Sequence, residues 1–306
     1  MLRPADLIRR ILVPTMALAM SACIIASAGD AGAVRIAQAG APHMTARQAA
    51  AFEAGDFDPG EIISDENFYD SSSMTAADVQ GFLHSQRCVP ADDSPCLADY
   101  RVDAAAQPTQ FAHCARYPGG RDLPASTIIV GIAHACGISP KVLLVLLQKE
   151  QSLITHPSAY GYQRATGYGC PDTADCDAHY FGFVNQLYNA AWQFREYGAS
   201  PGWRYHVGEV RVQYSPDRSC GSSVVSIRNQ ATANLYNYTP YQPDAATVRH
   251  PDGPASRCST FGNLNFSLIY QKWFGSPTTD RLPAWWGECL RYPAGGDCSS
   301  ADPAAP

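Results

Sequence analysis

The chain has 306 residues, of which 46% are apolar and only 16% charged, enough to bury one large hydrophobic core or two small ones. Its formal net charge of −6 argues against a nucleic-acid binder, because such proteins need a basic surface. After the N-terminus, no stretch of the sequence approaches the roughly 20 apolar residues that a membrane helix needs.

Residues 1–33 have the pattern of a secretory signal peptide. Three arginines among the first ten residues precede an uncharged apolar run, Ile11 to Ile25, and small-residue cleavage sites lie at 26–28 and 31–33. The segment before Cys23 loosely resembles a lipoprotein acylation site, but methionine fits its first position poorly. We therefore expect plain secretion, with a lipid-bearing Cys23 as the alternative.

Residues 34–60 are rich in Ala and Gly and lack a hydrophobic period, which indicates a linker. The globular domain is expected over residues 61–276, followed by a Pro-rich tail with a small disulfide loop at 277–306. Capping residues and apolar spacing predict a helix that begins at Thr75 and others over 126–135, 140–155, 182–197, 230–238 and 266–274, with strands over 210–214 and 224–228.

Eleven cysteines are present, and signal cleavage removes Cys23 and leaves ten. Ten cysteines in an oxidising compartment indicate five disulfides, although sequence does not determine their connectivity. Short loops favour the pairs Cys88–Cys96, Cys170–Cys176 and Cys289–Cys298. The cysteines then left over form the pairs Cys114–Cys136 and Cys220–Cys258. No Cys-x-x-Cys spacing occurs, so we expect neither a metal nor another cofactor.

The segment from Pro140 to Thr155 carries the main functional hypothesis. At 100° per residue, one arc about 120° wide contains Leu143, Leu146, Leu147, Leu153 and Ile154, with Glu150 in the middle. A carboxylate on a buried face is costly unless it is paired or stays protonated. A protonated Glu can donate its proton to a leaving glycosidic oxygen. The alternative is a pair between Glu150, near the helix end, and an arginine such as Arg164 or Arg195.

The end of this helix, Lys149-Glu150-Gln151-Ser152-Leu153, resembles the catalytic helix of the lysozyme-like superfamily, above all goose-type lysozymes and soluble lytic transglycosylases. A small residue usually follows the Glu in those families, whereas Gln151 intervenes here. The segment 180–186 resembles their Gly-rich turn before a helix with a cleft-facing Gln, and 188–191 is similar to their tyrosine motif with compressed spacing. The resemblance implies Glu150 as general acid.

Roughly residues 61–276 also resemble secreted actinobacterial proteins commonly labelled haemagglutinin-like. The segments that carry this resemblance are LLQKEQSL, GCPDT, YFGF-NQ-Y-AAWQF and NYTPYQP. This label says little about chemistry.

Three acids, Asp172, Asp175 and Asp177, lie in or beside a short cysteine loop about twenty residues after Glu150. Lysozyme-like folds place a β-hairpin across the cleft at this separation. Asp172, Asp175 or Asp177 would activate a water molecule or stabilise positive charge. The alternative is a purely structural loop, and lytic transglycosylases need no second carboxylate because the sugar's own hydroxyl attacks.

Aromatic and amide side chains are frequent after Glu150, and most of them are expected in the core. Sugar rings present apolar faces and hydroxyl edges, which aromatic and amide groups bind well. The side chains predicted to contact a glycan are Tyr168, Tyr180, Asn185, Gln186 and Tyr238.

The sequence therefore predicts a secreted monomer with a disulfide-stabilised, predominantly helical α+β domain of lysozyme-like type. It would cleave a polymeric cell-wall glycan, foremost peptidoglycan, by hydrolysis or transglycosylation. Zinc-peptidase, serine-hydrolase and phosphate-loop motifs do not occur. Two alternatives stay open: an enzyme for another wall polymer such as arabinogalactan, and a non-catalytic glycan-binding or adhesin-like protein on the same scaffold.

Overall fold

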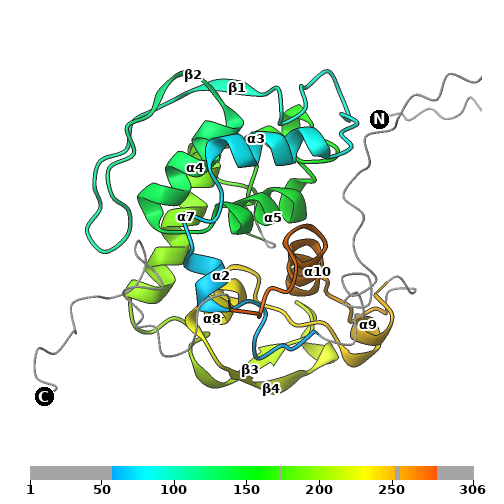
Figure 1. Ribbon diagram of the computed structural model, residues 1–306. Helices are drawn as coiled ribbons and strands as arrows, with labels where there is room; N and C mark the ends of the chain where they lie inside the picture. The colour runs from blue at the N-terminus through cyan, green and yellow to red at the C-terminus, as the bar shows by residue number, and fades with distance from the viewer. Residues whose placement is uncertain (1–56, 172–173, 252–255, 281–306) are drawn as a thin grey trace, which may run out of the picture. The chain divides into compact units, whose positions relative to one another are not determined.

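The computed structural model of the protein describes residues 57–171, 174–251 and 256–280 (Figure 1). The predicted signal peptide, the alternative lipidation site at Cys23 and the predicted Cys289–Cys298 loop lie outside the described residues. Asp172 lies outside them as well.

The described residues form an α+β unit in which helices predominate, as predicted. The helices are α2 Asp65–Tyr69, α3 Ala76–Ser85, α4 Ala125–Cys136, α5 Pro140–Gln151, α6 Ala159–Gln163, α7 Phe183–Ala199, α8 Gln230–Tyr238, α9 Ala245–Arg249 and α10 Gly262–Phe274. The strands are β1 Arg101–Ala104, β2 Gly120–Pro124, β3 Gly208–Gln213 and β4 Ser222–Ile227, and the 3-10 turns are η2 Ala178–Tyr180 and η3 Arg218–Cys220.

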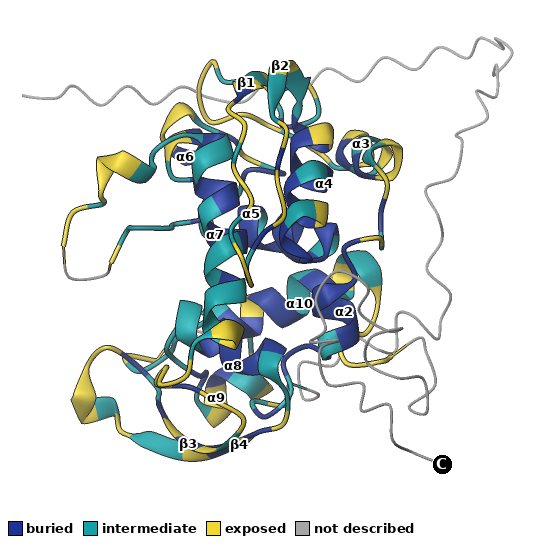
Figure 2. Ribbon diagram, turned by 90° about the vertical axis from the view of Figure 1, so that its left-hand side faces the viewer, coloured by how far each residue is buried: buried dark blue, intermediate teal, exposed yellow. Residues whose placement is uncertain are grey.

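Helix α5 lies at the centre of the core. It packs against α4 and α10, and α4 in turn packs against α7, so that their buried sides face one another (Figure 2). Six consecutive residues, Val142–Leu147, are each 0% exposed. The apolar arc read from the sequence therefore does not define a single buried face, because the middle of this helix is enclosed on every side.

Two antiparallel hairpins lie at opposite ends of this unit, β1–β2 beside α3 and α4, and β3–β4 beside α8 (Figure 1). The β3–β4 pair runs in regular register from Gly208↔Ile227 to Gln213↔Ser222. Sequence patterning predicted this pair but missed β1–β2. The described part of the segment after Glu150 forms α6, turns and η2, so the hairpin expected there is not what the structure shows.

Several helices begin or end where local capping residues predict it. The side chain of Thr75 accepts from the backbone of Asp78, which forms the predicted capping box, and Gly137 ends α4 at φ +65°. Helix α5 ends at Gln151, four residues before the predicted end. Ser152 takes φ +53°, and its N–H bonds to the carbonyls of Gln148 and Leu147, which closes the helix.

The predicted domain boundary at residue 276 lies inside a packed region. The side-chain amide of Asn67 donates to the carbonyls of Pro277 (2.9 Å) and Thr279 (3.1 Å). The backbone N–H of Ser64 also donates to the carbonyl of Pro277, at 3.0 Å. The start of the predicted tail is therefore fastened to α2.

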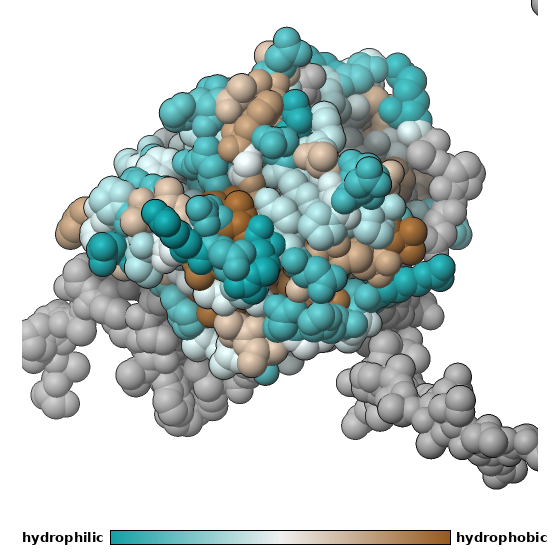
Figure 3. Space-filling model, turned by 90° about the horizontal axis from the view of Figure 1, so that it is seen from above, coloured by the Kyte–Doolittle hydropathy of each residue, from teal (hydrophilic) through white to brown (hydrophobic). Residues whose placement is uncertain are grey.

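The part of the chain that the structure describes contains no single helix with the length and apolar character to cross a membrane. Helices α4 and α5 reach that character only together, and a bend of 118° separates them. On the face seen from above in Figure 3, hydrophobic residues are scattered among hydrophilic ones, as is usual for protein surfaces.

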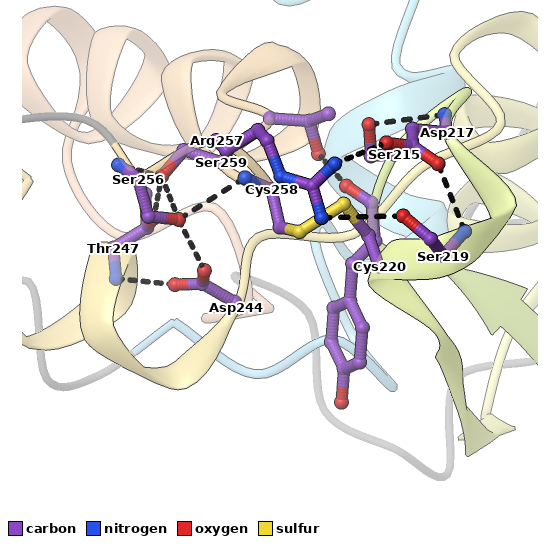
Figure 4. Close-up of a disulfide and its surroundings, with 12 residues drawn as sticks. Ser215, Asp217, Ser219, Cys220, Asp244, Thr247, Ser256, Arg257, Cys258 and Ser259 are labelled. Atoms are coloured by element: carbon purple, nitrogen blue, oxygen red, sulfur yellow. Dashed lines mark hydrogen bonds and ion pairs between the residues drawn. A yellow bond between two sulfur atoms is a disulfide. The ribbon is translucent and has the colours of Figure 1, made fainter.

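Four disulfides confirm four of the five predicted pairs: Cys88–Cys96, Cys114–Cys136, Cys170–Cys176 and Cys220–Cys258. The last one joins η3 to the segment before α10 (Figure 4). Beside it, Arg257 donates to Asp217 at 2.9 Å and to Ser219 at 3.2 Å. These disulfides fit an extracellular location, where thiols stay oxidised.

The disulfides should differ in their contribution to stability according to the length of chain they close. Cys220–Cys258 spans 38 residues and Cys170–Cys176 spans six. The chain-entropy model gives about 1.6 kcal/mol more stabilisation for the longer loop. Urea unfolding of the two double cysteine-to-serine variants should therefore show the larger loss for Cys220/Cys258. Equal losses would show that loop length does not govern these bonds.

The chain between β1 and β2 is tied to α7 through His113. Its Nε2 meets Glu196 Oε2 at 2.5 Å, its Nδ1 meets the carbonyl oxygen of Phe111 at 2.8 Å, and its ring stacks on Trp192 at 4.7 Å. The carbonyl of Phe111 and the carboxylate of Glu196 can only accept hydrogen bonds, so the ring of His113 is placed to donate to both. The bond from His113, followed by one from Ser200, holds the pKa of Glu196 below its ordinary 4.5.

This pair should contribute to stability against acid. A carboxyl group whose pKa is lowered by folding stabilises the fold above its ordinary pKa and loses that contribution as the pH falls through the folded value. Between pH 6 and pH 3, wild type should therefore lose more unfolding free energy than Glu196→Gln in urea titrations. Glu209→Gln, at an exposed position on β3, is the control and should follow wild type. Parallel losses in Glu196→Gln and wild type would contradict this role.

Candidate active site

Glu150 lies one residue before the end of α5, and its side chain is 23% exposed. The sequence predicted a position on the buried face, and the structure places it at the rim of the core instead. Glu150 Oε1 accepts a hydrogen bond from Nζ of the adjacent Lys149. The alternative of an ion pair near the helix end is therefore what forms, with Lys149 as partner in place of an arginine.

Lys149 is the residue of this site that sequence reasoning missed. Its side chain is only 6% exposed, and Nζ also donates to Thr239 Oγ1 at 3.0 Å. Neighbouring residues on a helix do not normally face each other, so the pattern gave no signal of this pair. Thr239 follows α8, ninety residues further along the chain, and only folding brings it here.

A glycine turn covers one side of the Glu150 carboxylate. Gly167 has φ +70°, and a Cβ atom built on it would lie 3.2 Å from Glu150 Oε2. Its backbone N–H donates to the carbonyl of Arg164 at 2.8 Å, which closes the turn. The backbone can approach the carboxylate this closely because residue 167 has no side chain.

Gln186 was predicted to contact the glycan, but it is 0% exposed. Its Oε1 accepts from the backbone N–H of Thr166 (3.3 Å) and of Tyr168 (3.1 Å). Its Nε2 donates to the carbonyls of Tyr168 and Tyr180, both at 2.8 Å. Both ends of the amide are therefore hydrogen-bonded. Gln186 holds the glycine turn in position and does not face a ligand.

Three predicted tyrosines surround the same turn. Tyr238 donates from its hydroxyl to the carbonyl of Thr166 at 2.7 Å. Burial first, and then the negative charge of Glu150, raises the pKa of Tyr238 well above its ordinary value. Tyr168 and Tyr180 pack edge to face at 4.8 Å, and both are partly exposed. The structure thus places Tyr238 near Glu150, and Tyr168 and Tyr180 beside the turn that faces Glu150.

The remaining predicted residues lie apart from this group. Asn185 is partly exposed, donates to the carbonyl of His179 at 2.8 Å and accepts from Asn189 at 2.7 Å. Asp175 is exposed on the Cys170–Cys176 loop, and no described contact joins it to Glu150. Asp177 caps η2 by accepting from the backbone of His179, which favours the structural interpretation of this acidic loop.

No group of three or more His, Cys, Asp or Glu side chains that could hold a metal ion occurs within the described ranges. The chemistry available at the site is therefore that of a carboxylate, an ammonium group and phenols. A carboxylate beside a lysine, at the surface end of a buried helix, can exchange protons with a bound ligand.

Together, the fold and this arrangement define an α+β domain, stapled by disulfides, that carries a Lys–Glu pair at the end of its central helix. Residues 61–285 match the family described as LasA, N-terminal domain, and the chain belongs to that family. This description names a domain and no activity, and neither resemblance drawn from the sequence motifs carries its name. Comparison with curated proteins found no match, and comparison with solved structures found none.

The Gly167→Ala variant should test the approach of the turn to Glu150. A side chain at φ +70° costs about 1–2 kcal/mol, and the added Cβ would press on Oε2. Gly221→Ala is the matched control, because φ is +79° there but nothing lies within 4 Å of the added atom. Thermal unfolding should show a loss in both variants. Quenching of tyrosine fluorescence by a titrated wall glycan should change only in Gly167→Ala, and equal behaviour of both would argue against a site at this turn.

Proposed function

We propose that this is an exported protein that binds a polymeric cell-wall glycan, foremost peptidoglycan, and cleaves it with Glu150 as general acid. The observation that carries the proposal is the setting of Glu150. It is a partly exposed carboxylate at the end of a helix whose middle is buried, faced by the Gly167 turn and near enough to Tyr238 to raise the pKa of that phenol. The resemblance of residues 149–153 to the catalytic helix of lysozymes and lytic transglycosylases supports the same role.

The pair with Lys149 sets a condition on this mechanism. A general acid must carry a proton, whereas the ion pair with Lys149 is made by the carboxylate. Glu150 would therefore take up a proton as the glycan binds and covers the pair. It would then donate this proton to the leaving glycosidic oxygen. The resulting carboxylate would accept a proton from the attacking group, a water molecule in hydrolysis or a sugar hydroxyl in transglycosylation.

A second candidate is a non-catalytic glycan-binding domain. Two observations favour it: the lysine partner of Glu150, which gives the carboxylate a structural role, and a family description that names an N-terminal domain. Partly exposed Tyr168 and Tyr180 would serve binding equally well in this case. The two candidates differ in whether any glycan bond is broken.

The Glu150→Gln variant should separate them. It removes the transferable proton, so release of soluble fragments from purified peptidoglycan should fall about 10²–10⁴-fold. Masses of the products would identify hydrolysis by reducing ends and transglycosylation by anhydro ends. Glu209→Gln, at an exposed position, is the control and should keep full activity. Arabinogalactan, assayed in parallel, tests the other wall polymer.

Stability must be measured on the same samples, because Glu150→Gln leaves the nearly buried ammonium of Lys149 without its anion. We expect a cost of up to about 3 kcal/mol in urea unfolding. The double variant Lys149→Met/Glu150→Gln removes both charges and should recover part of the lost stability. If wild type releases nothing from any wall glycan yet binds it as tightly as Glu150→Gln, the enzyme proposal fails and the binding domain replaces it.

A further inference from the structure

Arg164 is held between two aromatic rings next to the glycine turn. Its guanidinium carbon lies 4.0 Å from the ring centroid of Tyr160 and 4.3 Å from that of Phe181. Tyr160 belongs to α6 and is 61% exposed, whereas Phe181 follows η2. A guanidinium that rings stack against in this way is fixed in orientation, and its N–H donors lie along its edge, in the plane between the two rings.

No side chain or carbonyl of the described residues accepts a hydrogen bond from this guanidinium. Its Nε is buried without a hydrogen-bond partner, and no ion pair or side-chain hydrogen bond among the described residues includes Arg164. Arg101, Arg228 and Arg257, by contrast, each pair with a carboxylate.

The backbone around Arg164 connects it to the candidate active site. The carbonyl of Arg164 accepts from Gly167, the residue that faces Glu150, at 2.8 Å. The carbonyl of the preceding Gln163 accepts from Gly182 at 2.9 Å, which joins α6 to the segment that carries Phe181. The same short turn therefore bears both the carboxylate contact and the stacked guanidinium.

We propose that Arg164 is a binding subsite for a carboxylate group carried by the wall glycan. This inference rests on the proposed function only for the kind of polymer that is bound. The planar fork of a guanidinium matches a carboxylate with two parallel hydrogen bonds, and stacking on both faces orders the fork before the ligand arrives. Tyr160, exposed beside the guanidinium, adds a ring on which the sugar can lie.

The test is a sedimentation assay of binding to insoluble peptidoglycan. Loss of charge-assisted hydrogen bonds should weaken Arg164→Gln by about 10- to 100-fold. Arg164→Lys keeps the charge but lacks the fork, and should recover only part of the affinity. Arg204→Gln is the matched control, because Arg204 is exposed and stacks at 5.2 Å on Tyr205, in another part of the fold. It should bind like wild type.

The chemistry of the ligand is tested with the same material after its free carboxylates are converted to amides. Wild type should bind this material as weakly as Arg164→Gln binds untreated material. Immobilised polygalacturonate distinguishes the source of the carboxylate. Binding there that depends on Arg164 indicates a carboxylate on the sugar, and dependence on peptidoglycan alone indicates the peptide stems.

Equal binding of Arg164→Gln and wild type, or undiminished binding of wild type to amidated peptidoglycan, overturns the subsite. Melting temperatures and near-ultraviolet circular dichroism show whether each variant is folded. If Arg164→Gln unfolds, the comparison of Arg164→Lys with wild type on treated and untreated material still decides. The sedimentation assay measures binding and does not depend on cleavage. A protein that binds through Arg164 but releases no fragments therefore refutes the enzyme proposal and leaves the Arg164 subsite standing.

Discussion

The burial of α5 governs the remainder of this domain. With Val142 through Leu147 wholly removed from water, the polar side chains of this helix lie at its two ends, Lys141 in the first turn and Gln148 to Gln151 in the last. Water exclusion stabilises such a helix strongly, at about 25 cal/mol per Å² of apolar surface buried. The same burial forces Gln148, Lys149 and Glu150 to find partners within reach of the helix end.

Each of these three residues is satisfied in a different way. Gln148 turns back on the chain that leaves the helix, accepting from Ile154 at 3.2 Å and donating to Thr155 at 2.9 Å. Lys149 bonds to Thr239 and to Glu150, which stays partly exposed. The site therefore originates where a buried helix meets solvent, and its charge pair is part of how the helix ends.

The segments that face this helix end are ordered by polar and aromatic contacts as well as by apolar packing. Gln186 of α7 holds the glycine turn with both ends of its amide, and a short disulfide loop, Cys170–Cys176, follows the turn directly. Arg164 lies between rings from two different segments. Hydrogen bonds, a disulfide and stacked rings therefore fix the turns of this surface on the helices beneath them.

The sequence by itself determined the helical class and most helix positions, whereas the disulfide pairs that loop length favoured needed the structure to confirm them. Capping residues such as Thr75 and Gly137 act locally, so their signals are legible in a single chain. It also singled out Glu150, Tyr168, Tyr180 and Tyr238, which do lie around one turn. What only the tertiary structure decided is how each of them is used. Nζ of Lys149 bonds both to the adjacent Glu150 and to the distant Thr239, and Gln186 points into the protein. Arg164 is left without an acid among the described residues. These outcomes depend on contacts between segments far apart in the chain, and periodicity along one helix contains no information about them.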